Sequence, residues 1–230
     1  MRSEARLNVL MRLRQSTQSL HQALHRHPLL QDFTTDRTTV ERYQAVIEAF
    51  YGFYRPLEPT LIAAAAEAGC PSRYQQPIRT TWLEQDLRGL GYSMAAVKSL
   101  ACHRGLTRLS KSGWLAGCLY VIEGSTLGGK AIISSLSKHM NSEVLHSTHF
   151  FRGFREQTIP RWQNTCNFIR QVCDSSEQVL VASDTARLVF TALTEWLNEI
   201  ATERGLQPPA IDQNESSTKS GTHTAPDAAD

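Results

Sequence analysis

Histidine is the side chain best suited to chemistry near neutral pH, and three of the eight histidines gather at positions 21, 25 and 27. Leu20 and Leu24 place His21 on the apolar face of a predicted helix, so we expect this ring to face the core. His25 follows at the i, i+4 spacing, which allows a metal-binding pair but is a weak signal without a carboxylate. A histidine on an apolar face is more often a hydrogen-bonded core residue. Both interpretations stay open on spacing alone.

Glycines form the second unusual pattern, inside an apolar segment between Trp114 and Met140. Each glycine costs about 0.8–1 kcal/mol relative to alanine in a helix interior, so something must offset them. The offset is either the close approach of another helix or a kink, or a flat ligand that lies on bare backbone. At 100° per residue one narrow stripe contains Gly117, Val121, Gly124, Gly128 and Ile132, with Ser125 and Gly129 on its shoulder.

Other residue patterns typical of metal or catalytic sites are incomplete or absent. A dimetal carboxylate centre needs Glu-x-x-His pairs from two helices, and the chain has one such spacing, at Glu143 and His146. Phosphate-binding loops and serine nucleophile elbows are absent. The cysteines contain no C-x-x-C pair, and we expect them to be free thiols that pack as small hydrophobes. They are Cys70, Cys102, Cys118, Cys166 and Cys173.

Composition excludes several classes of partner. The 230 residues carry 24 basic and 22 acidic side chains, a net charge of +2, and the basic residues are scattered. This pattern indicates neither nucleic-acid binding nor an electrostatic membrane anchor. No apolar stretch reaches the ~20 residues that a bilayer span needs, and the first residues lack the apolar core of a secretory signal. We therefore expect a cytoplasmic protein.

Helical periodicity dominates the chain, whereas alternating strand patterns with hairpin turns are absent. We predict an all-α single domain over residues 1–206, with about seven or eight helices around one core. Residues 207–230 contain one large aliphatic side chain, Ile211, so we predict a disordered tail. The expected helices are 4–25, one from Thr38 or Thr39 that Pro56 and Pro59 kink or interrupt, 60–68, 80–90, 93–101, 114–140, one after Pro160, and 175–204 capped by Gly205.

Two segments together resemble the heme oxygenase family, in the bacterial form that accompanies phytochromes. Residues 13–21, LRQSTQSLH, are similar to the stretch that carries the proximal histidine, and residues 119–129, LYVIEGSTLGG, are similar to the distal helix. The order of the two motifs agrees, as do the Phe-Phe pair before Trp162 and a last helix with Phe190 and Trp196. The resemblance covers residues 7 to 204 and implies the family's helical bundle.

The resemblance implies a function and a set of site residues. Heme would be substrate and cofactor at once, and O2 would open it to biliverdin, CO and free iron. Electrons would come from an external donor, a ferredoxin or a flavoprotein reductase, and a bacterial phytochrome would receive the biliverdin. His21 would bind the iron, and Gly124, Ser125 and Gly128 would act on the distal side. The remaining heme-binding residues would be Arg14, Thr17, Tyr120, Val121, Gly129 and Phe190.

The chain departs from the family at several of these positions. Ser125 stands where animal and plant members have an aspartate, and a hydroxyl can still donate and accept hydrogen bonds. His25 replaces the acidic residue often found four positions after the proximal ligand. Arg14 matches the first of the basic residues that meet the heme propionates, whereas Gln18, Gln163 and Asn167 replace others. The seating of the heme, and the meso carbon attacked, stay open.

Two alternatives from other classes remain at this point. A heme carrier or sensor on the same fold would share the histidine and the glycines but would not turn heme over. A non-heme dimetal or thiamine-cleaving enzyme on a related helical scaffold would show no Soret band after heme is added.

Overall fold

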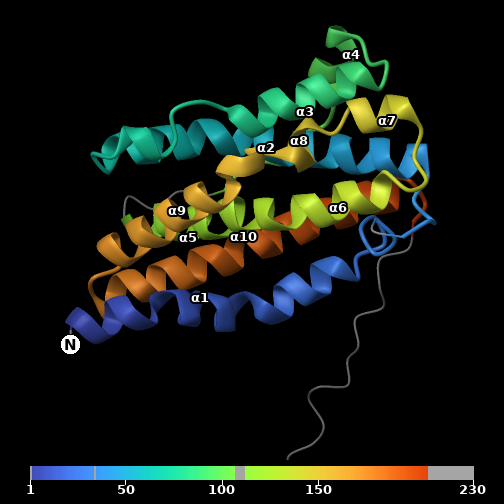
Figure 1. Ribbon diagram of the computed structural model, residues 1–230. Helices are drawn as coiled ribbons and strands as arrows, with labels where there is room; N and C mark the ends of the chain where they lie inside the picture. The colour runs from blue at the N-terminus through green and yellow to red at the C-terminus, as the bar shows by residue number, and fades with distance from the viewer. Residues whose placement is uncertain (1, 34, 107–111, 207–230) are drawn as a thin grey trace, which may run out of the picture.

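The computed structural model describes residues 2–33, 35–106 and 112–206, with side chains from residue 8 onward. The described residues form α-helices and short 3-10 turns without strands, so the predicted all-α class is confirmed (Figure 1). The described residues form more helices than expected. Two of them, α7 and α8, have only five and four residues, which is too short to be recognised from periodicity. The helices are α1 (Arg2–His25), α2 (Val40–Glu67), α3 (Ile78–Gly89), α4 (Met94–Ser99), α5 (Ser112–Ser125), α6 (Gly129–Leu136), α7 (Ser142–His146), α8 (His149–Arg152), α9 (Thr158–Val172) and α10 (Ser176–Glu203); the 3-10 turns are η1 (Pro71–Arg73), η2 (Thr126–Gly128) and η3 (Arg155–Gln157).

Capping residues set the helix boundaries close to where the sequence places them. The side-chain oxygens of Thr39, Ser93 and Ser175 each accept a hydrogen bond from the backbone N–H three residues on, at 3.1–3.3 Å. Such bonds satisfy N–H groups that have no partner inside the helix. Gly205 ends α10 with a φ of +69°, in the left-handed region that favours glycine.

Helix α2 contradicts the predicted interruption at its prolines. It runs from Val40 to Glu67 through both Pro56 and Pro59. A proline has no N–H, so Pro56 leaves the carbonyl of Gly52, four residues earlier, without its helical donor. The backbone N–H of His103 donates to that carbonyl at 3.0 Å. The segment that follows α4 thus supplies the hydrogen bond that the proline cannot make, and the helix continues.

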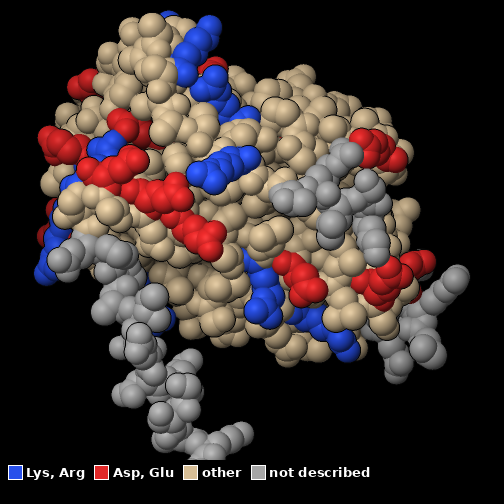
Figure 2. Space-filling view, turned by 180° about the vertical axis from the view of Figure 1, so that it is seen from behind, with Lys and Arg blue, Asp and Glu red and all other residues tan. Residues whose placement is uncertain are grey.

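Two layers of helices enclose the core. Figure 1 shows α1, α10 and the α5–α6 run on one side, with α2 and α3 across from them. Helix α10 packs against both α5 and α1, and α2 packs against α3. Trp114, Ala186 and Leu197 are fully buried between these elements. In Figure 2 acidic and basic side chains are interspersed on the face seen from behind. None of the described helices is long and apolar enough to cross a membrane.

Two of the stripe glycines lie where backbones approach each other closely. A Cβ atom at Gly117 would lie 2.3 Å from the carbonyl oxygen of Ala182 on α10, and one at Gly129 would lie 2.0 Å from the carbonyl oxygen of Phe151. Real Cβ atoms do not come this close to backbone, so at these two positions close packing explains the glycines. All five cysteines are free, as predicted, but only Cys118, Cys166 and Cys173 are buried; Cys102 is exposed, so the expectation that it packs as a small hydrophobe is wrong.

Replacing Gly117 with alanine should therefore destabilise the fold. The new methyl group must push α5 away from α10. This overpacking of the core should lower the free energy of unfolding by about 1–3 kcal/mol. Urea unfolding would measure the change, with Gly128→Ala as the matched control because a Cβ there meets no atom within 4 Å. Equal unfolding midpoints for the two variants would contradict the close approach at Gly117.

Candidate functional site

His21 lies one turn before the end of α1, and its side chain is exposed rather than facing the core as expected. The ring stands edge-on to Phe190 of α10, with 6.0 Å between the centroids, and edge-on to His25 at 4.6 Å. Within the described part of the chain neither ring nitrogen has a hydrogen-bond partner. The buried histidine of this stretch is His27, which bonds to Asn198 at 3.1 Å and accepts from the N–H of Leu29.

The surroundings of His21 favour its neutral form. Partial burial lowers its pKa, and the neighbouring His25 lowers it further, because a second positive charge beside it is unfavourable. A neutral imidazole has the free nitrogen lone pair that binds a metal ion. His21 is therefore available as a ligand at neutral pH.

A pH titration tests this arrangement. The pKa of His21 in the protein without ligand should lie below the ordinary value of about 6.5, so protons compete for the ring only at lower pH. His25→Ala should raise that pKa but not restore it fully, since burial is the larger cause. NMR titration of the imidazole protons would measure both values; an unchanged pKa in the variant would show that His25 does not influence the ring.

Helix α1 is joined to α5 one turn before His21. The hydroxyl of Thr17 bonds to the carbonyl of Leu13 at 2.7 Å and lies close enough to Tyr120 to lower the pKa of that tyrosine. Burial raises the pKa of Tyr120, whereas Thr17 and the charge of Arg14 lower it. Arg14, Thr17 and Tyr120 thus lie close to one another, and their role in binding heme stays a prediction.

The direction of the two helices places His21 and Gly124 on the same side of this contact. Helices α1 and α5 run the same way in Figure 1. His21 follows Thr17 by four residues, and Gly124 follows Tyr120 by four residues, so each lies one turn further along its helix. The histidine and the glycine segment consequently lie beyond the same side of the Thr17–Tyr120 contact.

The predicted 114–140 helix is broken at the glycine segment. Helix α5 ends at Ser125, the 3-10 turn η2 covers Thr126–Gly128, and α6 begins at Gly129. Ser125 Oγ donates to the carbonyl of Ile122 at 2.8 Å, and Thr126 Oγ1 donates to that of Glu123 at 2.6 Å. Side-chain bonds of this kind compete with the helical ladder and bend helices.

Gly124 and Gly128 differ from the two packed glycines. A Cβ at Gly128 would meet nothing within 4 Å, and one at Gly124 would only touch the Trp162 ring at 3.4 Å. Packing therefore does not require a glycine at either position. Val121, the other stripe residue expected at the site, is 7% exposed and belongs to the core.

Tyr54 of α2 is a site residue that the sequence analysis missed. Its side chain lies near Ser125, and burial raises its pKa, with lesser effects from Arg79 and Ser125 that lower it. A tyrosine on the buried face of a helix needs a partner for its hydroxyl, which was the available signal. Tyr54 therefore belongs to the surroundings of the Ser125 side chain.

These residues fit an iron porphyrin. The donor set consists of one neutral imidazole, the open side of Gly128 is bare backbone, and a partnered hydroxyl lies beside it. A dimetal centre lacks comparable support, since the described residues contain no group of three or more histidine, cysteine or acidic side chains that could hold a metal ion.

The chain matches the heme oxygenase family model over residues 7–199. It belongs to the heme oxygenase family. No curated protein matches the chain significantly. The family relationship supports heme degradation as the general function, with heme as the substrate.

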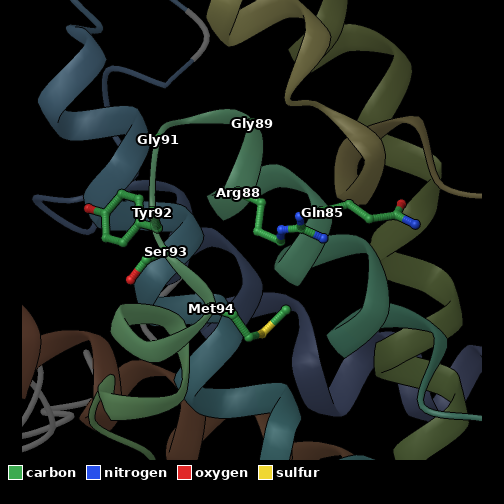
Figure 3. Close-up of a pocket in the computed structure, with 7 residues that line it drawn as sticks. All are labelled: Gln85, Arg88, Gly89, Gly91, Tyr92, Ser93 and Met94. Carbon is green, nitrogen blue, oxygen red and sulfur yellow. The ribbon is translucent and has the colours of Figure 1, made fainter.

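A shallow surface depression of this heme oxygenase lies elsewhere, at the turn between α3 and α4 (Figure 3). Its tyrosine, Tyr92, already donates a hydrogen bond to Glu48, and it contains no histidine or acidic side chain. We therefore assign it no part in heme chemistry. The lining residues are Gln85, Arg88, Gly89, Gly91, Tyr92, Ser93 and Met94.

The basic residues of this heme oxygenase differ from the family pattern as the sequence indicates. Gln18, Gln163 and Asn167 are exposed. Arg170, one turn after Asn167 on α9, donates to the Asn167 side chain at 3.1 Å. Burial raises the pKa of Cys166, and the charge of Arg170 lowers it to a lesser extent. Cys166 in turn influences Tyr120, so Arg170 is a second cation in the wider surroundings of that tyrosine.

Proposed function

We propose that this heme oxygenase binds heme through His21 and opens the porphyrin to biliverdin, CO and free iron. The observation that carries the proposal is the pairing of an unpartnered, neutral His21 imidazole with the bare backbone of Gly128 beyond the Thr17–Tyr120 contact. Bound heme would supply the iron that activates O2 and the meso carbon that is attacked.

The protein's own residues would orient the substrate. Phe190 limits rotation of the His21 ring by its edge contact. Gly128 would leave space beside the bare backbone for heme and its bound ligand, and Gly129 keeps α6 close to Phe151 so that this backbone stays in place. The Ser125 hydroxyl, which donates to the Ile122 carbonyl and lies near Tyr54, could hold or pass a proton on the distal side.

Arg14 and Arg170 would bind the propionates. Arg14 precedes His21 by seven residues, two helical turns or about 10 Å, so it lies on the same face at a distance from the iron ligand. Guanidinium groups bind carboxylates through paired hydrogen bonds. With Gln18, Gln163 and Asn167 uncharged, the two arginines would set the rotation of the heme and hence the meso carbon exposed to attack.

Electrons and product must pass to other proteins. The sequence contains no nucleotide- or flavin-binding motif, and we propose a ferredoxin or a flavoprotein reductase in the cytoplasm as donor. A phytochrome would then receive the biliverdin, in keeping with the phytochrome-associated resemblance.

Turnover under air tests the proposal. Hemin is titrated into the purified protein, then a reductant is added in the presence of catalase, which removes free peroxide as an alternative oxidant. The Soret band should disappear, the biliverdin absorption should rise, and one CO and one chelatable iron should form per heme. A persistent Soret band, with intact heme recovered on extraction, would instead identify a carrier or sensor.

A further inference from the structure

Arg79 of α3 is a fully charged side chain in the interior, only 1% exposed. Its guanidinium reaches three groups from two other elements. Nη1 donates to the Tyr74 hydroxyl at 2.9 Å, and Nη2 donates to the carbonyl of Ile122 at 3.2 Å and lies 3.2 Å from Glu123 Oε1. One side chain therefore clamps the last turn of α5 from outside the helix.

The base of this clamp is fixed to α2. Glu58 is fully buried and accepts hydrogen bonds from the backbone N–H groups of Arg79 at 3.0 Å and Thr80 at 2.8 Å, as well as from the Tyr74 hydroxyl. These N–H groups belong to the first turn of α3, where helical partners are missing. Glu58 thus holds the start of α3, and Arg79 with it, against α2.

Charge keeps the clamp engaged. Burial alone would lower the pKa of Arg79, but the nearby oxygens of Tyr74, Glu123, Tyr54 and Glu58 raise it overall, so the guanidinium stays protonated. Arg161 of α9 lies 3.7 Å from the same Glu123 carboxylate. A buried ion pair adds little net stability compared with apolar residues, but removing one partner is costly and the geometry it fixes is specific.

The clamped residues directly precede the distal segment. The Ile122 carbonyl accepts from both Arg79 and Ser125, and Ser125 lies near Tyr54. The 3-10 turn that leaves Gly128 bare begins at the next residue, Thr126. Arg79 therefore holds the residues that come just before the α-helix changes into a 3-10 turn.

We propose that Arg79 is a positioning residue that fixes the last turn of α5 and thereby sets the place of the Ser125 hydroxyl and of the bare backbone at Gly128. Its effect on heme degradation rests on the proposed function, whereas its effect on the distal segment rests on the contacts described above. Arg79 itself would not touch heme.

Hydrogen exchange of the protein without heme tests the structural part. In Arg79→Lys, which keeps the charge but loses the fork of donors, amides of residues 123–129 should exchange about tenfold faster, while those of α10 change by less than about threefold. Arg73→Met is the matched control, because Arg73 bonds to Asn164 and stacks on Phe168 without reaching α5. The control should exchange like the wild type at 123–129.

Glu123→Gln provides a second variant in case Arg79→Lys does not fold. It keeps an acceptor for Nη2 and the side-chain volume but removes the charge, so a smaller local increase in exchange, about threefold, is expected. Unchanged exchange at 123–129 in the folded variants, or an equal increase in every helix, would overturn the proposal and leave Arg79 as a support for α2–α3 packing.

The heme-loaded protein tests the consequence for the site. Arg79→Lys should bind hemin with the wild-type Soret position and a Kd within about threefold, since His21 is untouched, but kcat should fall at least about tenfold. An unchanged kcat would overturn the catalytic consequence. If the wild-type protein bound no heme, the proposed function would fail, and the exchange measurements would still decide the role of Arg79.

Discussion

Replacing His21 with alanine should remove the protein ligand from the iron while leaving the helical fold intact. The side chain is exposed and alanine is the best helix former, so the melting temperature should not fall. Loss of a residue that only hydrogen-bonds to a metal ligand lowers activity by up to about 100-fold. Loss of the axial ligand itself should therefore lower turnover by at least about 100-fold. The ferric spectrum should lose its histidine-ligated form, and added imidazole should restore part of the activity.

His25→Ala is the control for this experiment. It removes a ring 4.6 Å from His21 on the same exposed flank but should keep the histidine-ligated spectrum. A wild-type ferric spectrum in His21→Ala, together with a changed one in His25→Ala, would assign the iron to His25 instead.

Gly128→Leu should separate stability from function. A Cβ at Gly128 would meet no atom within 4 Å, and leucine is favoured over glycine by up to about 0.6–0.8 kcal/mol in a helix. The melting temperature without heme should stay equal or rise slightly. The side chain would occupy the space proposed for heme and its bound oxygen, so hemin affinity or turnover should fall at least about tenfold.

Gly128→Ala adds only a methyl group and should therefore lower turnover less than Gly128→Leu does. A leucine variant that melts well below the wild type yet degrades heme normally would show that Gly128 is needed for packing and not for the ligand.

Local signals in the sequence were sufficient for most of the helices. Ser93 and Ser175 carry their own capping chemistry, and the apolar period of α10 needs no information from elsewhere in the chain. The continuous path of α2 through Pro56 could not be predicted in this way, because the donor that compensates for the proline comes from His103, far along the chain.

The candidate site could be predicted only in part, because it too depends on contacts between distant segments. Spacing could group the glycines but could not separate Gly117, which packs against α10, from Gly128, which faces open space. The break before α6 depends on side-chain bonds of Ser125 and Thr126, and on Arg79, which reaches α5 from α3. Interactions between distant segments leave no periodic trace in the sequence.

The pairing of Gly52, Pro56 and His103 has a consequence for the order of folding. The carbonyl of Gly52 becomes an isolated acceptor only after α2 has formed as a helix around Pro56, so the segment after α4 cannot dock before then. We expect φ-values near zero for substitutions in residues 101–106 and higher values within α2. Destabilising this segment should therefore speed unfolding while the refolding rate stays nearly unchanged.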